Sequence, residues 1–374
     1  MSDEDAPPAG AGAGAENRPE DTTGQVVPEP NRPAAEARAT GRGRSALAWA
    51  GVAGWGAWAA LRLAGGDRIP GIGALGAPLL ALTPYVAAAA PVPLAAALLL
   101  RRPLAAAAAA VIMVSLLVTV VPREIGDGQP AARGPAVRVL TANVFFSEAG
   151  AAELVGLVRR TRPDVLSLQE LTTEGARRYE RAGLTDLLPH KFLDTRSGAA
   201  GSGLYSRLPL RGLPPLAGMR MATPQAEFTL PGGRRVEVTA VHPTPPIASP
   251  AYDAWRHDIA ALPSARAAAP RPAGRRTAAA TPRPADGAPV RILAGDFNAT
   301  LDHATLRALI GRGYADAADR TGNGLAPTWG PGGAGPPLTI DHVLFDRRGA
   351  ATAYAVHDLA GSDHRAVFAA IRLP

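Results

Sequence analysis

Leu293-Ala294-Gly295-Asp296-Phe297-Asn298-Ala299 places a carboxylate and a carboxamide two residues apart, directly after an apolar run. The run from Pro289 to Ala294 is bounded by glycines, which predicts a short buried strand. Side chains alternate along a strand, so Asp296 and Asn298 share one face if the extended backbone persists, and Phe297 then points into packing. Gly, Asp and Asn also dominate turns for local reasons, so the stretch alone fits either a site or a turn.

Five further stretches place polar side chains where an apolar run stops. They are Val137–Asn143, Asp164–Glu170, Val236–His242, Leu338–His342 and, close to the C-terminus, Gly361–His364. Together these stretches supply Asn, Glu, His and Asp side chains, which suit hard cations and acid–base chemistry. Their co-occurrence favours a functional site over a set of unrelated turns.

This set of motifs resembles the endonuclease/exonuclease/phosphatase superfamily, which includes DNase I, apurinic endonucleases, sphingomyelinases and inositol-phosphate phosphatases. The resemblance covers roughly residues 136 to 374, in the family's order and spacing. Its elements are Leu-Gln-Glu at 168–170, Gly-Asp-Phe-Asn at 295–298, Ile-Asp-His at 340–342 and Ser-Asp-His at 362–364. Each element is weak alone, and the combination is specific. The resemblance implies an α+β fold, a two-sheet β-sandwich flanked by helices.

Phosphoester hydrolysis needs a metal, a base for water and donors for the developing negative charge. Glu170 is the expected Mg²⁺ ligand, because Mg²⁺ prefers carboxylate oxygen and usually takes only one or two protein carboxylates; Mn²⁺ is an alternative. Asn143 is expected to give a neutral oxygen to the metal shell or to orient its water. Asp363 resembles the family's metal-shell or orienting residue. The chain has no cysteine, so thiolate ligands are excluded.

The family resemblance implies that Asp296 is the base that activates water and that Asn298 binds a phosphate oxygen. His364 is expected to be a second acid–base group or a transition-state donor, held in its tautomer by Asp341. His242 continues the apolar face of its strand, and in the family such a histidine contacts the scissile phosphate.

Other polar residues are weaker candidates. Tyr205 lies on an expected strand over residues 204–207 and is a weak candidate for a phosphate contact. His342 is expected to point away from the face of Asp341. The remaining histidines are expected on the surface: His190, His257, His303 and His357.

The N-terminal third differs in composition from the rest. Residues 1–44 have almost no large apolar side chain, which predicts a disordered tail. Within residues 45–121, three apolar segments follow at Ala46–Leu63, Ile72–Leu100 and Pro103–Val121. Each is long enough for a transmembrane helix of about 20 residues. A soluble helical hairpin is the alternative.

Arginines flank these apolar segments asymmetrically. The side that carries most of them holds Arg38, Arg42, Arg44, Arg101 and Arg102, opposed by Arg62 and Arg68. Basic flanks remain in the cytoplasm, so three spans deliver the C-terminal domain outside. The sequence therefore predicts a multi-pass protein of the cell membrane with an extracytoplasmic catalytic domain.

The catalytic domain is expected over residues 136–374, after a Pro- and Gly-containing linker at 122–135. Apolar spacing predicts helices over 154–162, 251–262 and 302–311, and a hairpin within 225–241 that turns at Pro-Gly-Gly. Residues 263–289 are Ala, Pro and Arg without periodicity, which predicts a disordered insertion.

These features favour a membrane-anchored, Mg²⁺-dependent phosphoesterase that acts on a lipid-linked phosphate or pyrophosphate beside the lipid bilayer. The arrangement is similar to the actinobacterial teicoplanin-resistance membrane phosphatases, which implies a lipid of the undecaprenyl-pyrophosphate type. An anchored extracellular nuclease is the alternative, because a net charge of +7 suits nucleic acid, although compositional bias also explains the charge. Aromatic residues make up only 5% of the chain, so few side chains can stack on nucleic-acid bases, which weakens the nuclease alternative. A non-catalytic phosphate-binding membrane scaffold is a second alternative.

Overall fold

The structure is a computed structural model that describes residues 32–265, 288–330 and 336–374, with side chains from residue 42 onward. The chain forms two compact units, Met1–Ala46 and Leu47–Pro374. The predicted tail is too long, because helix α1 begins at Arg32 and runs to Ala64. Its first residues are rich in Ala and Arg, which are strong helix formers but not large apolar residues. Residues 1–31 lie outside the described part of the chain.

The remaining N-terminal helices are short, apart from the last. After a 3₁₀ turn at Gly66–Arg68, they are α2 (Gly73–Leu80), α3 (Thr83–Ala88), α4 (Pro91–Leu99) and α5 (Pro103–Val120), with a further 3₁₀ turn at Val121–Glu124. The predicted second span is thus divided into three helices. Pro84 and Pro91 lie in the first turns of α3 and α4, where proline is tolerated because the missing N–H has no intrahelical partner.

The structure supports fewer membrane spans than the sequence predicts. Among the described residues, Pro103–Glu124 is the one helix long and apolar enough to cross a membrane. Gly73–Leu80 and Thr83–Leu99, bent by 62°, pass the same test only as one broken span. Three transmembrane helices are therefore not confirmed. The helices pack through small side chains such as Ala48, Ala97 and Ala109.

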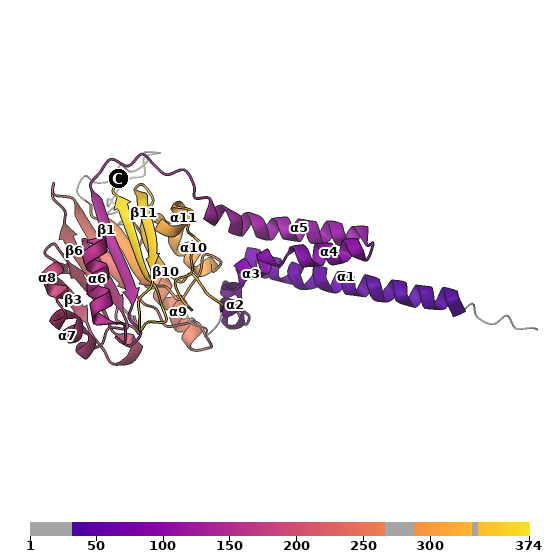
Figure 1. Cartoon of the computed structure of the whole chain (residues 1–374), viewed down its shortest axis with the longest axis horizontal. Coiled ribbons are helices and arrows are strands. Elements are labelled where there is room, and N and C mark those ends of the chain that lie inside the picture. Colours follow the sequence, from indigo (N-terminus) through magenta and orange to yellow (C-terminus); the bar gives the residue numbers. More distant parts are fainter. Residues whose placement is uncertain (1–31, 266–287, 331–335) are drawn as a thin grey trace, which may run out of the picture. The chain divides into compact units, whose positions relative to one another are not determined.

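Two six-stranded sheets form the C-terminal domain (Figure 1). The first has the order β11-β12-β1-β2-β4-β3, with strands Ala350–His357, Ala366–Arg372, Ala136–Asn143, Val165–Gln169, Ser202–Ser206 and His190–Asp194. The second has the order β5-β6-β7-β8-β10-β9, with strands Arg211–Gly212, Gln225–Thr229, Arg235–Val241, Val290–Asp296, Asp341–Asp346 and Tyr314–Asp316. Each sheet has one parallel pair, β1–β2 in the first and β7–β8 in the second, and the other pairs are antiparallel.

Apolar side chains from both sheets form one core between them, for example Val139 of β1, Ile292 of β8 and Val343 of β10. Helices cover the outer faces: α6 (Ala151–Thr161), α7 (Thr173–Arg181) and α8 (Leu184–Leu187) on the first sheet, and α9 (Ala251–Ala261) and α10 (Ala304–Ile310) on the second. A short α11 (Ala317–Arg320) follows β9. The predicted two-sheet sandwich flanked by helices is confirmed, as are its hairpin and helices. Most of the predicted insertion, residues 266–287, lies outside the described residues.

Strand register brings the polar strand ends together. Asn143 of β1 pairs with Gln169 of β2, so Glu170 follows directly beside it. Asp341 of β10 pairs with Asp296 of β8. A Cβ atom at Gly295 would lie 2.0 Å from the carbonyl oxygen of Val241, so only glycine allows β7 and β8 to approach here.

Candidate active site

Asn143 holds two carboxylates side by side at the end of β1. Its Nδ2 donates to Glu170 Oε1 at 3.1 Å and to Asp296 Oδ2 at 3.2 Å, whereas its Oδ1 accepts from the Phe145 backbone N–H at 3.0 Å. Glu170 has a left-handed backbone, with φ of 58°, and its Oε2 accepts from the Phe146 N–H at 3.0 Å. In this arrangement the amide of Asn143 orients the carboxylates, and its metal-shell role stays a prediction.

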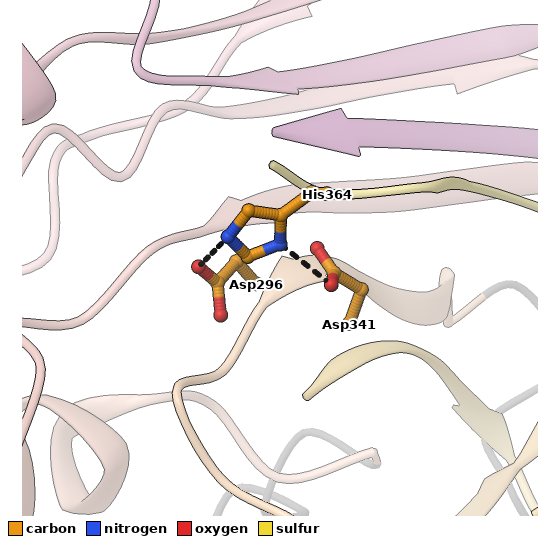
Figure 2. Close-up of side chains that lie close together, drawn as sticks. All are labelled: Asp296, Asp341 and His364. Carbon is orange, nitrogen blue, oxygen red and sulfur yellow. Dashed lines mark hydrogen bonds and ion pairs between the residues drawn. The ribbon is translucent and has the colours of Figure 1, made fainter. Parts of the chain in front are cut away.

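His364 lies between two carboxylates, as Figure 2 shows. Its Nδ1 lies 2.9 Å from Asp341 Oδ2, and its Nε2 lies 3.7 Å from Asp296 Oδ2. Burial lowers the pKa of His364, but the carboxylates of Asp341 and Asp296 outweigh burial and raise the pKa to about 10. The two carboxylates therefore favour the protonated imidazole, whose Nε2 can donate a proton.

Asp296 ends β8, and the chain turns immediately after it. Asn298 has φ of 49°, and its N–H donates to Asp296 Oδ1 at 2.8 Å, so the extended backbone does not persist to Asn298. Asn298 Nδ2 donates to the Pro243 carbonyl at 3.0 Å. Phe297 is fully buried, as predicted. Burial raises the pKa of Asp296, and the opposing effect of His364 is smaller, so this carboxylate is suited to accept a proton.

His242 and Asp363 complete the cluster from two further segments. His242 Nε2 lies 3.6 Å from Asp296 Oδ2 and 3.8 Å from Glu170 Oε1, and burial lowers the pKa of His242 despite the Asp296 carboxylate. Asp363 Oδ2 accepts from Trp329 Nε1 at 3.1 Å, while its Oδ1 has no hydrogen-bond partner among the described residues. The left-handed turn before Asp363 is what lets Asp363 and His364 share a site.

Six of these side chains line one pocket of about 430 Å³. They are Glu170, His242, Asp296, Asn298, Asp363 and His364. Asn143 and Asp341 lie behind this surface and contact it through Glu170, Asp296 and His364. The structure therefore brings together eight of the nine residues that the sequence singles out.

Tyr205 is the ninth, and its predicted phosphate contact is wrong. The side chain is fully buried between the first sheet and its helices, near Tyr179, and its hydroxyl donates to Glu180 Oε1 at 3.2 Å. Every residue of β4 is buried, so both faces of the strand are covered and no polar alternation marks the face toward the helices.

Two pocket residues are missed by sequence reasoning. His303, expected on the surface, is 2% exposed, lines the pocket and contacts the Ala77 carbonyl through Nε2 at 2.7 Å. Trp329 lines the pocket and holds Asp363. Neither belongs to a motif, and the partner of His303 lies in the N-terminal helices. His342 points away from the site, as expected, and contacts Asp316 at 2.5 Å. The other three histidines are exposed or half-exposed.

The residues present fit a divalent cation that prefers oxygen. Atoms of Asp296, Asp341 and His364 lie within 4.8 Å of one another, a spacing that suits metal ligands. Because Asp341 and Asp296 flank the His364 imidazole, the same trio also suits proton transfer. Further oxygens at the same pocket come from the Glu170 carboxylate and from Asp363 Oδ1, which accepts no hydrogen bond among the described residues and lies 4.0 Å from His364 Nε2. Such a donor set suits Mg²⁺ or Mn²⁺.

Comparison with known proteins agrees with the motifs. A model of the endonuclease/exonuclease/phosphatase family matches residues 140–364, which include the eight clustered residues. Comparison with curated proteins gave no match. Among solved structures, the chain is similar to an endonuclease/exonuclease/phosphatase from Beutenbergia cavernae DSM 12333, with 19% identity, a TM-score of 0.46, and 64% of this chain and 72% of that chain covered.

Two further solved structures are similar. One is D. rerio TDP2 complexed with a single strand DNA product, with 15% identity, a TM-score of 0.46, and 63% of this chain and 98% of that chain covered. The other is the endonuclease domain of TRAS1, a telomere-specific non-LTR retrotransposon, with 16% identity, a TM-score of 0.43, and 64% of this chain and 99% of that chain covered. The family model spans more than half of the sequence. The chain therefore belongs to the endonuclease/exonuclease/phosphatase family of phosphoesterases and nucleases, which typically depend on a divalent metal.

Proposed function

We propose that the protein is a membrane-anchored, metal-dependent phosphoesterase that acts on a lipid-linked phosphate or pyrophosphate outside the cytoplasmic membrane. The central observation is the arrangement of Asp296 between a proton-carrying His364 and the Asn143–Glu170 pair. A base with a raised pKa and a cationic donor then face the same pocket, which is the combination that hydrolysis of a phosphate ester requires.

Glu170 and Asp363 would hold the cation, Mg²⁺ or Mn²⁺, with Asn143 orienting Glu170. When bound, the cation supplies positive charge that polarises the phosphoryl group and neutralises the carboxylates.

Asp296 takes a proton from the attacking water as the new O–P bond forms and the P–O bond to the leaving group breaks. His364 donates its Nε2 proton in a hydrogen bond to a phosphoryl oxygen, and Asp341 keeps the imidazole oriented. Asn298 and His242 line the same pocket and bind phosphate oxygens.

The apolar N-terminal helices support the membrane part of the proposal. The helix Pro103–Glu124 is long and apolar enough to span, and the bent pair before it passes the same test only if it is one broken span. Attachment to a bilayer keeps the site close to a lipid substrate and raises its effective concentration. The resemblance that the sequence arrangement suggests, to teicoplanin-resistance membrane phosphatases, would make a polyprenyl pyrophosphate the substrate.

Cysteine labelling in intact cells tests the orientation, because the natural chain has no cysteine. Arg181→Cys, at a position whose side chain is 71% exposed in the catalytic domain, is expected to react with a membrane-impermeant maleimide. Pro103→Cys, exposed in the segment expected on the cytoplasmic side, should react only after the cells are permeabilised. The reverse pattern would refute an extracytoplasmic domain.

An anchored nuclease is the competing proposal, favoured by the net charge of +7 and by the nucleases within the family. A panel of polyprenyl pyrophosphate, phosphoinositide, sphingomyelin and DNA, each with Mg²⁺ and with a chelator, tests the two. We expect chelator-sensitive release of phosphate from the lipid pyrophosphate and no DNA cleavage. DNA cleavage without lipid turnover would establish the nuclease, and no turnover of any substrate would favour a non-catalytic scaffold.

A further inference from the structure

The pocket that holds the catalytic residues has a second, apolar side. Pro78 of α2, Ala81 directly after α2, Pro246 and Ile247 after β7, and Leu338 before β10 all line it. These residues come from three segments, and one of them belongs to the N-terminal helices rather than to the sandwich. One cavity therefore joins charged groups that suit a phosphate to a surface that suits hydrocarbon.

Helix α2 is fixed in this position by buried polar contacts. His303 Nε2 contacts the Ala77 carbonyl at 2.7 Å, and Ala77 is fully buried. Asp67, in the turn before α2, accepts from the backbone N–H groups of Ala304 and Thr305 at 2.8 Å each. These contacts join α2 to the first turn of α10, which begins a few residues after Asn298. These buried contacts therefore hold the α2 side of the pocket in place beside the candidate catalytic residues.

Outside the pocket lining, helix α2 exposes further large apolar side chains. Ile247 is 77% exposed at the pocket, and Leu75 and Leu79 of α2 are 73% and 44% exposed. Exposed large apolar side chains such as Leu75 and Leu79 suit contact with a bilayer. Helix α2 is also the first arm of the bent apolar pair that passes the length and composition test for a broken span.

We infer that α2 is part of the substrate site and that this apolar surface binds the first carbons of the chain attached to the phosphate. The substrate class is then an alkyl or polyprenyl phosphate, whose phosphate faces His364 and Asp296 and whose chain contacts Pro78, Ile247 and Leu338. The inference rests on the proposed phosphoesterase function, and it adds that the membrane helices contribute directly to substrate recognition.

Binding of alkyl phosphonates tests this inference without turnover. The full chain in lipid nanodiscs is titrated calorimetrically, with Mg²⁺ present, with phosphonates from methyl to hexyl. Each methylene that reaches the apolar surface is expected to tighten binding by up to about fourfold. Chain-independent affinity would overturn the inference, whatever the activity of the protein.

Matched variants separate the pocket surface from general partition into the bilayer. Pro78→Asn and Ile247→Asn place a polar side chain in the pocket and are expected to weaken hexyl phosphonate binding about fivefold, with methyl phosphonate binding nearly unchanged. Leu75→Asn makes a comparable change on the same helix outside the pocket lining, and should leave both affinities unchanged. Equal losses in all three variants would show that partition into lipid, and not the pocket, sets the chain dependence.

The same experiment distinguishes this inference from the proposed function. Chain-dependent binding that Pro78→Asn abolishes, in a protein that hydrolyses no phosphate ester, would overturn the phosphoesterase and keep the apolar site. Rapid hydrolysis of methyl and hexyl phosphates at equal kcat/KM in wild type and Pro78→Asn would keep the phosphoesterase and overturn the role of α2.

Discussion

Asp296→Asn is expected to lower kcat by about 10² to 10⁴-fold while leaving the affinity for Mg²⁺ nearly unchanged. The variant keeps the shape of the side chain and the contact from the Asn298 N–H to Oδ1, which is 2.8 Å long. It loses the carboxylate whose pKa burial raises, and with it the acceptor for the proton of the attacking water. A steady-state rate measured across a range of Mg²⁺ concentrations gives both quantities.

Glu170→Gln is the informative counterpart, because the two carboxylates share the amide of Asn143 but have different proposed roles. This variant should weaken Mg²⁺ binding, and excess Mg²⁺ should restore part of the activity, since mass action corrects a ligand defect and not a missing base. Asp194→Asn, in an exposed pair with Arg196, serves as the control and should match wild type. Rescue of Asp296→Asn by Mg²⁺, without rescue of Glu170→Gln, would show that the roles are reversed.

Asp302→Asn is expected to lower the free energy of unfolding by about 3–5 kcal/mol, because it leaves buried guanidinium groups without their carboxylate. Asp302 is fully buried and lies 2.5 Å from Arg62 Nε and 2.6 Å from Arg123 Nη2. One arginine belongs to α1, and the other follows α5. The carboxylate therefore joins the C-terminal end of α1 and the turn after α5 to the loop that follows Asp296. Chemical unfolding in detergent measures the loss.

The pH dependence of stability should report the same group. Burial alone would raise the pKa of Asp302, but Arg123 and Arg62 outweigh burial and hold the pKa below its usual value. A carboxyl with a lowered folded pKa stabilises the protein above its unfolded pKa of about 3.9, and this contribution disappears as the pH falls through the folded value. Asp302→Asn should remove this acid-sensitive contribution to the free energy of unfolding. Glu174→Gln, in an exposed pair with Arg181, should change neither stability nor its pH profile. Equal stability of the two variants would contradict a structural role for Asp302.

The clustering of the candidate site residues could be predicted from the sequence because each of three apolar runs stops at a polar side chain. The apolar runs before Asn143, Glu170 and Asp296 are buried strands, and their ends lie at one edge of the sandwich. Short motifs also place Asp341 and His364, whose contact spans only 23 residues. The sequence pattern does not predict local backbone conformation: Asn298 is left-handed, so strand β8 ends at Asp296.

The contacts that escape sequence reasoning join distant segments. The partners of Asp302 lie 240 and 179 residues away, and the carbonyl that His303 contacts lies 226 residues away. The spacing of apolar residues along the chain carries no information about such pairs, so the sequence wrongly predicts His303 on the surface. Tyr205 fails for a related reason, because a strand covered on both faces shows no alternation from which its inner side can be identified.

The pairing of β1 with β12 sets when the catalytic domain can form. β1, the first strand of the domain, pairs along its length with the last strand, from Ala136 opposite Arg372 to Thr141 opposite Val367. β12 also pairs with β11, so the final residues occupy the interior of the first sheet. A growing chain therefore cannot complete that sheet until β12 has been synthesised, and contacts so distant in sequence form slowly.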